Sequence, residues 1–117
     1  KRKPKKGKVY LLKAMDEDGL FIYKYGATTQ INTKQRIRSA NSKLKLKFEE
    51  IATFDVIDVF ARENEFMWFF TCSWRVERYN FNFIWIEDIY TRLGETFVSD
   101  CGIDEDLINI MKEICHG

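Results

Sequence analysis

The chain has 117 residues, 45% of them apolar and 15% aromatic, which suits one domain with one modest core. Its formal net charge is +1, and it contains no apolar run of the roughly 18 residues that a membrane span needs. The three cysteines form no C-x-x-C pair, which favours a reduced, cytoplasmic protein, and the single histidine, His116, excludes Ser-His-Asp catalysis.

The first seven residues predict a flexible basic tail in front of a single domain over residues 8–117. Five of the first six residues are basic, and residues 27–48 hold six basic residues and no acid. Two basic segments indicate contact with one polyanion, DNA with RNA as the alternative, and such a tail is also compatible with a nuclear location. The other interpretation of each charge run is an ordinary solvated surface.

Residues 8–15 and 20–27 predict two antiparallel strands, because both are rich in β-branched and aromatic residues. Gly19, in the loop between them, is available for a positive φ. Side chains alternate between the two faces of a strand, so the loop length decides which residues share a face. A four-residue loop would set Tyr10 and Lys24 on opposite faces. If these two residues act in one site, as the resemblance given below implies, the loop must have an odd length or contain a bulge, involving Gly19, that brings both to one face.

After the hairpin, hydrophobic periodicity and capping residues predict further helices and strands. Asn32 or Thr33 caps the first helix, Asp58 caps a second, almost wholly apolar helix, and Asp104 starts a last, amphipathic helix. The expected bounds are 33–44 (helix), 47–56 (strand), 59–74 (helix), 94–98 (short strand) and 104 onwards (helix), with 77–89 mixed. This order predicts an α+β fold with a small antiparallel sheet.

The order of the first motifs resembles the GIY-YIG nuclease module over residues 8 to about 70. The motifs are Lys8-Val9-Tyr10 in the first strand, Lys24-Tyr25-Gly26 in the second, and Arg36 on the next helix. Lys8 stands where the family has glycine and Lys24 where it has tyrosine, the latter as in a small phage-type and restriction-type branch. The resemblance implies a three-stranded antiparallel sheet flanked by helices, here with a C-terminal strand and helix as an extension.

The resemblance also implies a DNA endonuclease that uses Mg²⁺ or Mn²⁺, with Tyr10, Lys24, Arg36 and Glu65 in the active site. A carboxylate such as Glu65 would hold the cation, since the chain has no histidine pair or cysteine cluster for a softer metal. A phenol with a pKa of roughly 10 is a poor base unless nearby cations favour the phenolate. Lys24 and Arg36 would be those cations for Tyr10, and the fork of Arg36 would stabilise charge on the phosphate.

The second helix offers two carboxylates. Helical phase groups Glu63 with Val59 and Phe66, whereas a family pattern of glutamate followed three residues later by tryptophan favours Glu65, with Glu63 as the alternative metal ligand. A charge in so apolar a helix is costly unless it is paired or metal-bound. We expect Arg36 and Glu65 to bracket one phosphate on the sheet face that carries Tyr10.

Other residues are predicted to contact nucleic acid: Gly26, Thr28, Lys34, Arg38, Lys43 and Lys45. Each has a plainer interpretation, because glycine late in a strand often marks a bulge and surface lysines are often only solvated. Of the two arginines on the first helix, one is expected to face the sheet and the other solvent. The alternative function is a catalytically inactive module that binds DNA or a protein.

Overall fold

The computed structural model describes residues 3–71, 83–85, 96–99 and 102–116. Within these residues, five strands form one antiparallel sheet in the order β3-β1-β2-β5-β4. Their bounds are Gly7–Met15 (β1), Phe21–Thr28 (β2), Glu49–Val56 (β3), Phe83–Trp85 (β4) and Thr96–Ser99 (β5). The predicted α+β fold, with β2-β1-β3 as a small antiparallel sheet flanked by helices, is confirmed.

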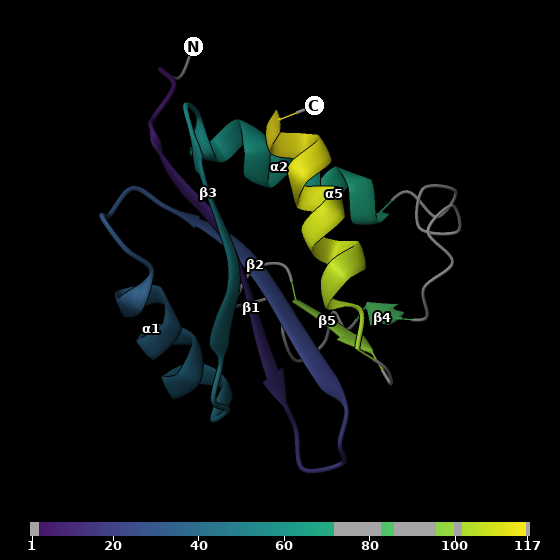
Figure 1. Ribbon diagram of the computed structural model, residues 1–117. Helices are drawn as coiled ribbons and strands as arrows, with labels where there is room; N and C mark the ends of the chain where they lie inside the picture. The colour runs from purple at the N-terminus through teal and green to yellow at the C-terminus, as the bar shows by residue number, and fades with distance from the viewer. Residues whose placement is uncertain (1–2, 72–82, 86–95, 100–101, 117) are drawn as a thin grey trace.

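Three described helices cover the two faces of the sheet: α1 (Lys34–Leu44), α2 (Val59–Thr71) and α5 (Asp104–His116). Figure 1 shows α1 on one side of the strands and α2 with α5 on the other. None of the helices in the described part of the chain is long and apolar enough to cross a membrane.

The β1–β2 hairpin has the predicted odd-length loop. Met15 pairs with Phe21, which leaves five loop residues, and Gly19 adopts a φ of 80°. The carboxylate of Asp16 accepts hydrogen bonds from the backbone N–H groups of Asp18 and Leu20 and so closes the turn. With this register, Tyr10 pairs with Gly26 and Leu12 with Lys24, which confirms that Tyr10 and Lys24 share a face.

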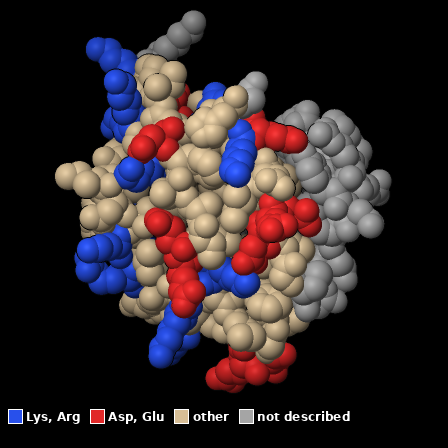
Figure 2. Space-filling view, in the orientation of Figure 1, with Lys and Arg blue, Asp and Glu red and all other residues tan. Residues whose placement is uncertain are grey.

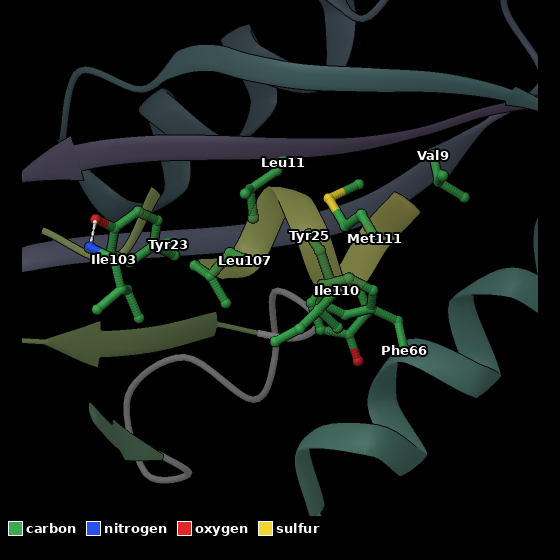
Figure 3. Packing of buried hydrophobic residues seen from close by; sticks show 9 residues of the cluster. All are labelled: Val9, Leu11, Tyr23, Tyr25, Phe66, Ile103, Leu107, Ile110 and Met111. Carbon is green, nitrogen blue, oxygen red and sulfur yellow. Dashed lines mark hydrogen bonds between the residues drawn. The ribbon is translucent and has the colours of Figure 1, made fainter. Parts of the chain in front are cut away.

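The larger core lies on the face covered by α2 and α5. Val9, Leu11, Tyr23 and Tyr25 of the hairpin pack there against Phe66 of α2 and against α5, as Figure 3 shows. The amphipathic character predicted for the last helix is confirmed, because Leu107, Ile110 and Met111 of α5 are buried and Ile108 and Ile114 pack beside them.

The smaller core lies under α1, on the opposite face. Tyr10, Leu12, Ala14 and Ile22 are buried there with Ala40 and Phe48, and Ile37 and Leu44 pack against them. The α1 residues in this core, Ile37, Ala40 and Leu44, have the spacing of three and four residues that predicts a helix.

Several boundaries differ from the sequence prediction. Gly7 belongs to β1 rather than to the tail, and the carbonyl of Lys5 accepts a hydrogen bond from the N–H of Val59. The predicted C-terminal strand, β5, pairs with β2 and so extends the same sheet. The predicted strand at 94–98 corresponds to Thr96–Ser99, and residues 94 and 95 lie outside the described residues.

Candidate functional site

Tyr10 and Gly26 form a close pair across β1 and β2. Tyr10 is 3% exposed, and a Cβ placed on Gly26 would lie 2.7 Å from the Cζ atom of its ring. Gly26 lies in a regular ladder without a positive φ, so the interpretation of this residue as a bulge is wrong. Because Gly26 has no side chain, the Tyr10 ring can lie against the backbone of β2 at this position.

Lys24 lies on the same face, next to this pair. It is opposite Leu12 in the β1–β2 ladder, and it is 9% exposed. A buried ammonium is costly without a partner, and Lys24 makes at least one hydrogen-bond, ring or electrostatic contact. The hairpin register alone therefore brings together Tyr10, Lys24 and Gly26, three of the residues selected from the sequence.

Arg36 is presented by α1, the helix that covers this face. Arg36 precedes the buried Ala40 by four residues, about one helical turn, so the two residues lie on the same side of α1. Arg36 and Arg38 are both exposed, so neither is buried against the sheet. The sheet contact of α1 is made by small and aliphatic residues instead, and an exposed Arg36 remains accessible to an anion.

Glu65 lies elsewhere. It is on α2, which packs through Phe66 on the opposite face of the sheet, and its carboxylate forms an ion pair of 2.9 Å with Arg62. Arg62 also donates to the carbonyl of Ile114 in α5, so the pair belongs to the contact between these two helices. The expected convergence of Glu65 with Arg36 and Tyr10 on one face is therefore not what the fold produces.

Glu63, the alternative, is half-buried on the inner side of α2, as its helical phase indicated. It lines a mostly apolar gap together with Tyr10, Tyr25 and Gly26. The gap has a volume of about 10 Å³, roughly the least that holds one water molecule. A cation with its bound waters needs more space than this gap offers.

Basic side chains gather along one side of the molecule. Figure 2 shows Lys and Arg along the side of the N-terminal segment and α1, and acidic residues over α5 and at the β1–β2 turn. The predicted contacts Lys34, Arg38, Lys43 and Lys45 are all exposed there. Thr28 differs from them, because it is 2% exposed and its hydroxyl accepts a hydrogen bond from the N–H of Gln30.

A groove of about 460 Å³ opens at the end of the sheet where β1 begins and β2 and β3 end. It is lined by Lys6, Gly7, Lys8, Thr29, Gln30, Asp55, Val56 and Ile57. Lys8 forms an ion pair of 2.5 Å with Asp55, whereas Lys6 is exposed. The groove is thus lined both by residues of the basic N-terminal segment and by the segment that leads into α1.

A polar network on the other face fixes the start of α5. The hydroxyl of Tyr23 donates to Asp104 and accepts from the N–H of Ile103, and Lys13 pairs with the same carboxylate at 2.9 Å. Partial burial acts to raise the pKa of Asp104, but the bonds from Tyr23 and Lys13 outweigh it and lower that pKa. These contacts join α5 to the hairpin and lie on the face opposite Tyr10.

One contact at the start of α1 has no signal in the sequence. Thr33 occupies the N-cap position, but its hydroxyl donates to the carboxylate of Glu50 in β3 at 2.5 Å rather than to the helix backbone. The side-chain oxygen of Asn32, rather than that of Thr33, accepts a hydrogen bond from the backbone N–H of Lys34. Glu50 is one of two adjacent strand carboxylates, and nothing in its neighbours along the chain distinguishes it.

Comparison of the chain with protein-family models, with curated proteins and with solved structures finds no match. Within the described ranges, no group of three or more His, Cys, Asp or Glu residues is placed to hold a metal ion. Inferences about function therefore depend on the residues themselves.

Proposed function

We propose that the protein is a nucleic-acid phosphodiesterase of the GIY-YIG type that cuts DNA on the sheet face that carries α1. The observation that carries the proposal is the hairpin register, which brings Tyr10, Lys24 and Gly26 to that face. Arg36 stands on the helix covering the same face. The motif order in the sequence and the three-dimensional arrangement of these residues thus support the same site.

Each residue has a role that fits its chemistry. The planar fork of Arg36 would bind the scissile phosphate and neutralise charge on its oxygens. Tyr10, held against Gly26, would take the proton of the attacking water, and the charge of Lys24 would favour the phenolate. The exposed lysines and Arg38 of α1 would contact neighbouring phosphates without sequence preference.

Mg²⁺ or Mn²⁺, when bound, would supply positive charge at the phosphate. Glu65 does not fit the role of its ligand, because it pairs with Arg62 on a helix that packs on the opposite face. Glu63 faces a gap too small for a hydrated cation. No step is therefore assigned to either glutamate.

The proposal is tested by incubating the protein with supercoiled plasmid and Mg²⁺ or Mn²⁺. We expect nicking or cutting, lost in Arg36→Ala and reduced on the order of 100-fold or more in Tyr10→Phe. Lys112→Ala is the control, since Lys112 is exposed on α5, away from this surface. A wild-type protein that binds plasmid but leaves it intact with both cations would contradict the proposal.

A second candidate is a GIY-YIG-like module that binds nucleic acid without cutting it. The burial of Tyr10, 3% exposed, and the ion pair of Glu65 favour this alternative. It predicts that binding depends on the basic residues of α1 and is unaffected by Tyr10→Phe.

A further inference from the structure

Strand β3 contains a bulge whose effect is to change the face on which one carboxylate lies. Leu11 pairs with Ala52, whereas Leu12 pairs with Glu50, so the register shifts between Leu11 and Leu12 and skips Ile51. In an unbroken ladder Leu12 would pair with Ile51, and Glu50 would lie with Lys13 on the α5 side. The bulge instead brings Glu50 to the face of Leu12.

On that face, Glu50 stands in one row with the residues of the candidate site. Leu12 has Glu50 on one side and Lys24 on the other, and Tyr10 lies in the next row with Thr53 and Gly26. The carboxylate is fixed by the hydroxyl of Thr33, which is 5% exposed and stands at the N-terminus of α1. Glu50 is itself exposed, so it can meet a ligand from solvent.

We propose that Glu50 is the carboxylate that holds the divalent cation of this site. The inference rests on the proposed function and gives Glu50 the role of cation ligand, which neither Glu65 nor Glu63 fits. Mg²⁺ and Mn²⁺ bind through one or two carboxylates, completed by water and phosphate oxygens, so one protein ligand suffices. Asp55, an acid on the same face, is instead ion-paired with Lys8. Removal of the Glu50 charge should therefore weaken cation binding.

Cation binding can be located without any cleavage. Mn²⁺ is titrated into ¹⁵N-labelled protein, and the paramagnetic broadening of backbone amide signals is mapped onto the chain. We expect broadening centred on residues 33 and 49–51, and loss of that broadening in Glu50→Gln. Glu65→Gln is the control, expected to leave the map unchanged. Broadening centred on residues 62–66, or none at millimolar Mn²⁺, would overturn the inference.

The cleavage assay separates this inference from the proposed function. We expect Glu50→Gln to lower cleavage on the order of 100-fold, while Glu65→Gln cuts normally. If Arg36→Ala and Tyr10→Phe abolish cutting but Glu50→Gln does not, the function stands and the role of Glu50 is refuted. If the wild-type protein does not cut DNA, the proposed function is refuted, and the Mn²⁺ broadening map alone tests whether Glu50 binds the cation.

A further variant, Thr33→Val, compared with Glu50→Gln, distinguishes a cation ligand from a merely structural role of Glu50. The amide oxygen of Gln can still accept the hydroxyl of Thr33, so Glu50→Gln keeps the link between β3 and α1. Thr33→Val breaks that link but keeps the carboxylate. If Glu50 only joins the two elements, Thr33→Val should abolish Mn²⁺ broadening as fully as Glu50→Gln, which would overturn the inference. Should Glu50→Gln fail to fold, the wild-type map still tests it.

Discussion

The ring of Tyr10 lies directly over the Cα atom of Gly26, so close that a Cβ there would be 2.5 Å from the Tyr10 hydroxyl oxygen. The two residues are paired across strands β1 and β2. Gly26→Ala should therefore push the Tyr10 ring out of place and destabilise the protein by about 1–3 kcal/mol, with loss of any cleavage. Urea denaturation measures the first effect and the plasmid assay the second.

A matched control exists at Gly102, where an added Cβ would meet nothing within 4 Å. Gly102→Ala should leave stability unchanged or raise it slightly. Combining Gly26→Ala with Tyr10→Ala should cost less than the sum of the single changes, because the clash disappears with the ring. Strict additivity in that double-mutant cycle would mean that the two residues do not contact each other in solution.

The network around Asp104 predicts a pH dependence of stability. Its pKa in the folded protein is lowered, so its contribution is fully present above the unfolded pKa of about 3.9 and is lost as pH falls through the folded value. Asp104→Asn should cost about 1 kcal/mol at pH 7, and the difference from wild type should shrink toward pH 3. Asp18→Asn, in the exposed hairpin loop, should show neither effect. Unfolding curves at both pH values check this.

Basic residues of α1 should control the salt dependence of DNA binding. Replacing Lys34 and Arg38 by Gln should weaken binding to unrelated DNA sequences alike and reduce the salt slope by about 0.9 for each phosphate that the protein no longer neutralises. Lys112→Gln, exposed on α5 away from this surface, is the control. Fluorescence anisotropy at several salt concentrations measures the slope. An unchanged salt slope would mean that Lys34 and Arg38 do not contact DNA phosphates.

Helix α5 should be indispensable to the fold. Leu107 is 0% exposed and packs in the larger core, so Leu107→Ala should cost about 2–5 kcal/mol. Asn109→Ala, exposed on the same helix, should cost far less. Truncation before residue 94 should unfold the protein, as judged by circular dichroism. A truncated chain that folds and cuts DNA would show that the core under α1 is sufficient.

Local patterns in the sequence were enough to predict most of the helices and strands. Side-chain alternation made the shared face of Tyr10 and Lys24 depend on the length of the hairpin loop, and the strand bounds read from the sequence left a four-residue loop, which would set them on opposite faces. An odd-length loop was expected only because the two residues were taken to act together, and the structure has the five-residue loop that brings them to one face. The buried stripes of α1 and α5 follow from 3.6-residue periodicity.

Only the tertiary structure decided where the carboxylates lie. Helical phase distinguished the inner side of α2 from its outer side, but the sheet face that receives α2 depends on how the chain crosses after β3. That choice separates Glu65 from Tyr10. The bulge that turns Glu50 toward the site arises from pairing between β1 and β3, about 40 residues apart along the chain. Such long-range pairing leaves no periodic trace in either strand, so the position of Glu50 could not be predicted from its neighbours in the sequence.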